Sequence, residues 1–189
     1  VYSKGACILR NLRFVVGDET FFKILKTYVE RYKFKTVRTK DFISVCEEVS
    51  GMNLSWFFNQ LLFSTEAPRY SIQSVKAWKN GSKYTLEVVV VQTQRKLFKM
   101  IVPIVVETKS GKVTFRVWIN SSTEKLVFNL DSRPIRVSVD PYEEVCGEDK
   151  RNTLEVTGLP PEIPVKLLAA VLIVVVVAII LKKKFSRRS

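Results

Sequence analysis

The sequence predicts an α+β protein in which helices come first, a β-sandwich follows and one transmembrane helix comes last. Apolar residues recur at helical spacing up to about residue 66, and they alternate with polar residues between residues 70 and 139. An uninterrupted apolar run then fills residues 167–181. We therefore expect five parts: a helical region (1–66), a sandwich (67–145), a stalk (146–162), a transmembrane helix (163–181) and a basic tail (182–189).

Residues 1–66 are predicted to form four helices. The apolar stripes begin near Lys4, Asp18, Thr39 and Asn53, and Gly17 and Gly51 are helix terminators. The fourth stretch is apolar nearly all round, at Leu54, Trp56, Phe57, Phe58, Leu61 and Leu62. Because a helix that is hydrophobic on every side must be covered, we expect this region to be one wall of a larger domain.

Residues 67–145 are predicted to fold as an Ig-like β-sandwich. After Pro68 the apolar period changes to two, and Asn80-Gly81 and Ser110-Gly111 separate strand-like runs as tight turns do. Six or seven short strands at this spacing are typical of such a sandwich. The following residues 146–162 contain acidic groups and paired prolines, which favours a stalk.

The apolar run Leu167–Leu181 predicts a membrane anchor. Extended back to Ile163 it is long enough to cross a bilayer as a helix, and Lys182–Lys184 follow it at once. The positive-inside rule then places the C-terminus in the cytoplasm and residues 1–162 outside. Sequons at Asn53, Asn80 and Asn120 agree with an external face. The alternative is a tail anchor with the N-terminal part in the cytoplasm.

Composition excludes several kinds of site. The sequence contains no histidine, so it cannot build a His-based zinc site or a Ser-His or Cys-His nucleophile. Cys7, Cys46 and Cys146 are too few for a four-ligand site, and Cys46 lies on an apolar stripe that favours the core. Six of the basic residues behind the net charge of +13 lie at positions 163–189, in and beside the apolar run. We therefore do not expect nucleic-acid binding.

Four segments follow one another in a characteristic order: Val1–Ala6 (VYSKGA), Leu12–Phe22 (LRFVVGDETFF), Glu48–Gln60 (EVSGMNLSWFFNQ) and Pro68. They resemble the VYxKGA, LRxxLGDExFF, SGxDLSWFFDQW and GxP segments of M1-family zinc aminopeptidases, the aminopeptidase N-like gluzincins. The resemblance is close over residues 1–70 and looser over the sandwich. It implies that residues 1–66 are the helical C-terminal lobe of a thermolysin-like catalytic domain.

The resemblance also implies a catalytic role for one residue. Tyr2 occupies the position of the family's tyrosine, which donates a hydrogen bond to the oxyanion of the tetrahedral intermediate. Lys4 is either a supporting residue or solvated. The family's zinc is held by two histidines of HExxH and a distant glutamate, and neither HExxH nor the family's GxMEN segment occurs in this sequence. We therefore expect zinc in the complete enzyme, with no ligand from this chain.

Two hypotheses follow. In the first, the chain is the C-terminal portion of a membrane-anchored metalloaminopeptidase that hydrolyses N-terminal residues from peptides. Its partners are then peptide substrates, the N-terminal zinc-binding portion and the lipid bilayer, and the chain alone is inactive. In the alternative, it is a non-catalytic membrane-anchored surface protein that binds partners through its sandwich. An HExxH motif in the sequence upstream of this chain would support the first hypothesis, and its absence would support the second.

Overall fold

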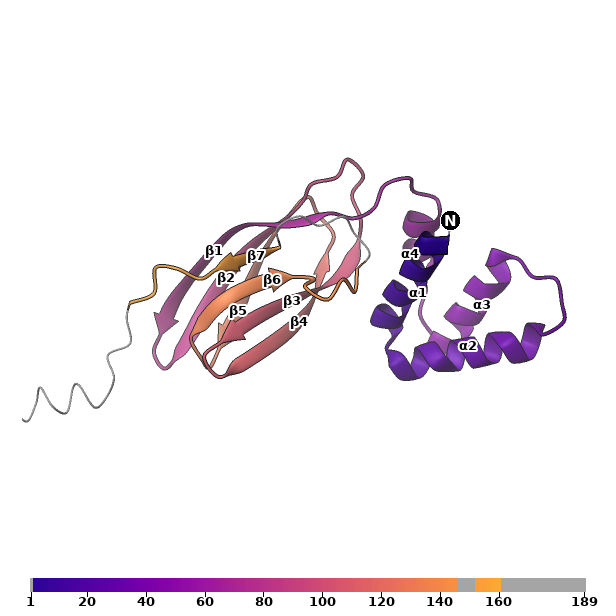
Figure 1. Ribbon diagram of the computed structural model, residues 1–189, viewed down its shortest axis with the longest axis horizontal. Helices are drawn as coiled ribbons and strands as arrows, with labels where there is room; N and C mark the ends of the chain where they lie inside the picture. The colour runs from indigo at the N-terminus through magenta and orange to yellow at the C-terminus, as the bar shows by residue number, and fades with distance from the viewer. Residues whose placement is uncertain (1, 146–151, 161–189) are drawn as a thin grey trace, which may run out of the picture. The chain divides into compact units, whose positions relative to one another are not determined.

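The computed structural model describes residues 2–145 and 152–160 (Figure 1). The predicted order of four helices followed by antiparallel strands is confirmed. The helices are α1 (Tyr2–Val16), α2 (Asp18–Tyr32), α3 (Thr39–Ser50) and α4 (Ser55–Leu62). Of the described residues, 2–145 and 152–158 belong to one compact unit.

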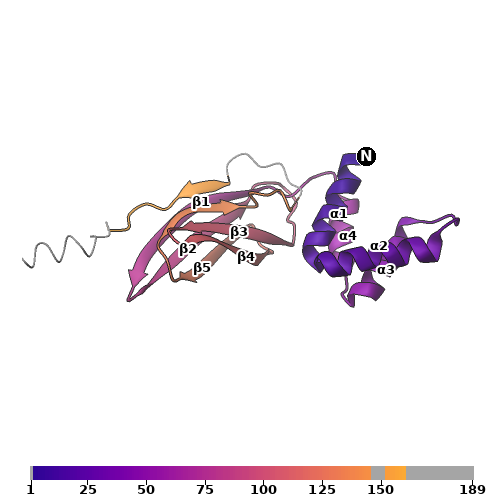
Figure 2. The same ribbon diagram turned by 60° about the horizontal axis from the view of Figure 1, so that its bottom comes forward.

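The helices bury the stripes that their sequences predict. Ile8, Leu12 and Val15 on α1 are buried, and so are Phe21 and Ile24 on α2. Both views show α1 beside α4 and α2 beside α3 (Figures 1 and 2). Gly17 alone separates α1 from α2, and its φ of 85° favours glycine.

The strands form two antiparallel sheets, which we call the two-sheet region. One sheet has the order β1-β2-β5 and the other the order β4-β3-β6-β7. The strands are β1 (Tyr70–Asn80), β2 (Lys83–Gln92), β3 (Met100–Thr108), β4 (Gly111–Ile119), β5 (Thr123–Leu130), β6 (Pro134–Val139) and β7 (Thr153–Glu155). The two predicted tight turns are confirmed, because Asn80 pairs with Lys83 and Thr108 pairs with Gly111.

The two sheets share a core made by alternate residues. Leu86, Val88 and Val90 on β2 are fully buried, as alternation with period two requires. Phe115 of β4 stacks on Phe128 of β5 with their ring centroids 4.3 Å apart, so a ring contact joins one sheet to the other.

The C-terminal part differs in one respect from the prediction. Residues 153–155, within the predicted stalk, pair with β6 as the strand β7. Among residues 2–145 and 152–160, no helix is long and apolar enough to cross a bilayer. The predicted transmembrane helix (163–181) and the basic tail (182–189) lie outside the described residues.

Candidate functional site

The predicted catalytic residue, Tyr2, is the first residue of α1. Its backbone belongs to the described structure and its side chain lies outside it. The position of Tyr2 therefore follows from the contacts that hold α1. Three basic side chains make these contacts, one at each end of the helix and one between.

Lys4 holds the first turn of α1 against the end of α4. Its Nζ donates to the carbonyl oxygens of Leu62 (3.1 Å) and Ser64 (2.7 Å). Leu62 is the last residue of α4, and the last carbonyls of a helix have no partner within the helix. The ammonium group therefore caps the negative end of α4, whose own last turn contains no basic residue. Lys4 is a supporting residue.

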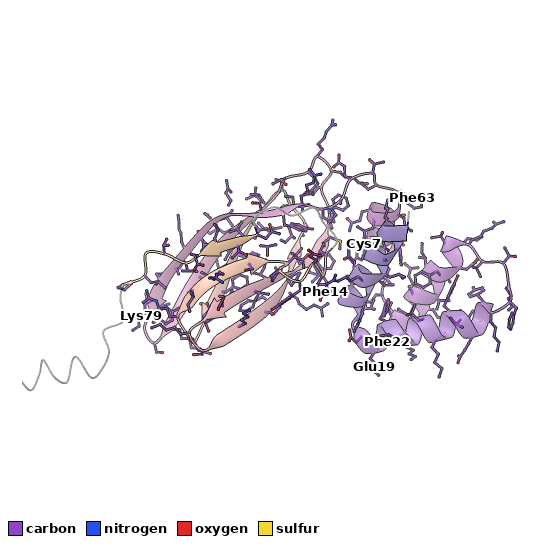
Figure 3. All side chains as sticks on the ribbon, viewed as in Figure 1. Cys7, Phe14, Glu19, Phe22, Phe63 and Lys79 are labelled. Carbon is purple, nitrogen blue, oxygen red and sulfur yellow. The ribbon has the colours of Figure 1, made fainter. Side chains whose placement is uncertain are left out.

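Arg116 makes the corresponding contact at the other end of α1. From β4, its Nη2 donates to the carbonyl oxygens of Phe14 and Val15, the latter at 3.4 Å. Its guanidinium carbon also lies 4.6 Å from the centroid of the Phe14 ring, which Figure 3 labels on α1. The two-sheet region thus supplies the C-terminal cap of α1.

A loop after β6 contacts α1 between its two ends. Arg10 donates to the carbonyl oxygen of Tyr142, and its Nε lies 3.6 Å from a carboxylate oxygen of Glu144. Asp140 shapes this loop, because its carboxylate accepts from the amides of Glu144 (2.7 Å) and Val145 (2.9 Å).

The LRFVVGDETFF segment forms the corner between α1 and α2. Arg13 donates through Nε and Nη2 to the two carboxylate oxygens of Asp18, at 2.9 and 2.6 Å. These hydrogen bonds hold the pKa of the Asp18 carboxyl below its ordinary value. The same guanidinium lies over the ring of Phe22 at 5.2 Å, so three residues of the segment meet in one place.

The SWFFNQ segment of α4 contacts both the helices and the sheets. Phe57 and Phe58 are buried, whereas Trp56 packs edge-on against Trp118 of β4 with centroids 4.9 Å apart. Gln60 accepts from the backbone N–H of Lys99 (2.9 Å) and donates to its carbonyl oxygen (2.7 Å). The sheets therefore cover one side of this helix.

A pocket of about 910 Å³ opens beside α1. Lys4, Cys7, Ile8 and Asn11, which share one face of the helix at spacings of three and four, line it. Glu66 and Glu143 face the same space. The pocket combines a helix face of mixed polarity with acidic side chains from other segments.

The described residues do not fit a zinc ion. Within residues 2–145 and 152–160, no group of three or more Cys, Asp or Glu side chains could hold a metal, and the sequence has no histidine. Cys7 is disulfide-bonded, whereas Cys46 is a free thiol in the core, as its apolar stripe predicts. Burial raises the pKa of Cys46 to about 12. The third cysteine, Cys146, lies outside the described residues.

Comparison with known proteins gives the class of protein. The sequence model described as "Peptidase family M1 domain" matches residues 1–61. Aminopeptidase N of Streptomyces lividans is 42% identical over 53 residues, covering 28% of this chain and 6% of the relative. Probable aminopeptidase 2 of Sulfurisphaera tokodaii is 27% identical over 141 residues, covering 74% of this chain and 17% of the relative.

A solved structure extends the likeness to the fold of both regions. The crystal structure of Legionella pneumophila aminopeptidase A in complex with aspartic acid has a TM-score of 0.64 and is 16% identical. The match covers 78% of this chain and 17% of that one, so the chain spans a small part of the length of its relatives. Residues 1–61 match the peptidase family M1 model, so the resemblance read from the sequence is confirmed.

Proposed function

We propose that this chain supplies the C-terminal portion of an M1 aminopeptidase that removes N-terminal residues from peptides. The observation that carries the proposal is the match of residues 1–61 to the peptidase family M1 domain, with Tyr2 at the start of a helix held at both ends. The zinc ligands of the complete enzyme come from another portion. Residues 67–145 act as an Ig-like sandwich that supports the helical lobe of a thermolysin-like catalytic domain.

In this proposal Tyr2 donates a hydrogen bond to the oxyanion that forms when the scissile carbonyl is attacked. A phenol suits the role because its O–H is a neutral donor on a rigid ring, and the bond strengthens as negative charge develops on the oxygen. Such a contact lowers the barrier because it is stronger in the transition state than in the ground state. Holding α1 at both ends keeps this donor in place.

The surface of the helices supports a further partner. Several large apolar side chains on or beside these helices are exposed, among them Phe22 (54%), Val29 (61%) and Phe63 (76%). Figure 3 shows Phe22 on α2 and Phe63 at the end of α4. Exposed apolar side chains in this number favour a macromolecular contact. We assign that contact to the zinc-binding portion of the catalytic domain.

We also propose that residues 163–181 anchor the protein in a lipid bilayer. Their apolar length and the lysines and arginines after them support this proposal. Residues 1–162 are then extracytoplasmic. Protease added outside intact cells should digest the two-sheet region and spare a tag placed after Ser189, and the reverse pattern would favour the tail-anchor topology.

The catalytic proposal is tested by Tyr2→Phe in the complete enzyme, meaning this chain joined to or in complex with a portion that contains HExxH. Removal of the hydroxyl should lower kcat by about 10²–10³, the usual effect of losing one oxyanion donor. KM and bound zinc should change little. Tyr142→Phe, at an exposed tyrosine of the loop beside α1, is the matched control.

Two results would contradict the proposal. Near-normal kcat in Tyr2→Phe with full zinc content would make Tyr2 a packing residue. A genomic neighbourhood that encodes no HExxH, upstream or in a separate polypeptide, would favour the non-catalytic surface protein instead.

A further inference from the structure

Lys4 couples two helices whose ends are far apart in the sequence. Its ammonium group bonds the carbonyl oxygens of Leu62 and Ser64, which lie 58 and 60 residues further along the chain. Leu62 ends α4, and Ser64 is buried in the connection from α4 to β1. The start of α1 is thus attached to the point where the helical region becomes the two-sheet region.

This attachment completes a clamp on α1. Arg116 of β4 bonds the carbonyl oxygens of Phe14 and Val15 at the C-terminal end of the helix. Lys4 is the counterpart at the N-terminal end, two residues after Tyr2. A helix fixed only at its C-terminal end is free to fray or shift at its first turn, since that turn has no intrahelical acceptors for its N–H groups. The bonds of Lys4 restrain that turn.

The bonds of Lys4 are also specific in their chemistry. Two carbonyl oxygens converge on one Nζ, and a carbonyl oxygen can only accept a hydrogen bond. A cation with several N–H donors satisfies both, and the end of the α4 macrodipole favours its positive charge. An apolar side chain of the same length fills the space without making either bond.

We infer that Lys4 is a positioning residue for Tyr2: by capping α4, it fixes the first turn of α1 and so sets where the phenol donates its hydrogen bond. This inference rests on the proposed function. An oxyanion donor must lie within hydrogen-bond range of the place where the charge develops, and a displacement of about 1 Å can lower a rate by about 10²-fold.

The test is a double-mutant cycle in the complete enzyme, with Lys4→Met made in the wild-type and in the Tyr2→Phe background. We expect Lys4→Met alone to lower kcat by about 10- to 100-fold while KM changes less than about twofold. In the Tyr2→Phe background it should lower kcat little further, because the donor that it positions is already gone. Lys4→Arg should restore most of the activity.

The matched control is Lys23→Met, at an exposed lysine of α2. If Lys4→Met does not fold, Lys4→Gln, which keeps a neutral amide NH2 group as donor, takes its place in the same cycle. Equal losses of kcat from Lys4→Met in both backgrounds would overturn the inference and leave the proposed function standing. Unchanged kcat in Lys4→Met would also overturn it. Unchanged kcat in Tyr2→Phe would overturn both.

Discussion

The guanidinium of Arg116 both caps α1 at the carbonyl oxygen of Phe14 and lies 4.6 Å from the centroid of the Phe14 ring. One side chain of the two-sheet region therefore contacts the backbone and the side chain of a single residue on a helix. Such a double contact requires a planar cation with several donors, which arginine provides and lysine does not.

Arg116→Lys should weaken the junction because lysine keeps the charge and loses the planar guanidinium that lies over the Phe14 ring. We expect a loss of about 0.5–1 kcal/mol in the free energy of unfolding, the usual contribution of a cation–π contact at an exposed site. Urea unfolding followed by circular dichroism measures it. Lys112→Ala, at an exposed position of the same strand, should cost less than about 0.5 kcal/mol. Equal stabilities of the two variants would show that the contact contributes nothing.

Gln60→Ala should loosen the contact between α4 and the sheets. The side-chain amide makes two hydrogen bonds to the backbone of Lys99, and their loss should cost about 1–2 kcal/mol. Limited proteolysis should then cut faster between residues 63 and 69, where the helical region joins β1. The neighbouring Asn59, which is exposed, gives the control Asn59→Ala. A Gln60→Ala chain that resists protease as well as Asn59→Ala does would contradict this role.

The ion pair between Arg31 of α2 and Glu48 of α3 predicts a lowered pKa for the Glu48 carboxyl. Arg31 bonds both carboxylate oxygens of Glu48 at 2.7 Å, and these bonds hold the pKa of Glu48 below its ordinary value. A lowered folded-state pKa stabilises the fold above the ordinary pKa of glutamate, and this stabilisation is lost as the pH falls through the folded-state value. NMR titration should show the low pKa in the wild type. In Arg31→Gln it should rise towards the ordinary value, and an unchanged titration would refute the pairing.

Cys46 should be inert to alkylation in the folded chain. Burial raises the pKa of its thiol from 9.0 to about 12, so almost no thiolate is present at pH 8. The stability that follows from keeping this thiol neutral is full below pH 9 and is lost as the pH rises towards 12. Iodoacetamide should label the Cys46 peptide only after unfolding in guanidinium, as mass spectrometry can show. Labelling at the unfolded rate in native buffer would place the thiol at the surface.

The elements with strong local patterns could be predicted from the sequence. The second helix was expected to begin near Asp18, where α2 begins, and the turns expected at Asn80-Gly81 and Ser110-Gly111 join paired strands. Helices and strands of this kind are predicted by apolar residues that recur every 3.6 or every 2 residues. This spacing can be recognised within a short stretch of sequence. β7 was missed because three residues in a polar segment contain too few periods to detect.

The contacts that hold α1 and α4 could not be predicted in the same way. Arg116 lies 102 residues from Phe14, and Gln60 lies 39 residues from Lys99. A surface arginine or glutamine has no local signature that distinguishes a solvated side chain from one that bonds a distant carbonyl. Only the family resemblance drew attention to Lys4, and its partners became known with the fold.

The short strand β7 has a consequence for how the folded chain meets other molecules. Without it, the backbone of β6 would lie open as a sheet edge, and open edges recruit strands from other molecules into aggregates. β7 occupies three positions of that edge, and Glu155 on it pairs with Arg136 at 2.7 Å. The edge that β7 offers to a second molecule is therefore only three residues long and carries a charged pair. Short, charged edge strands disfavour pairing with a strand of another chain.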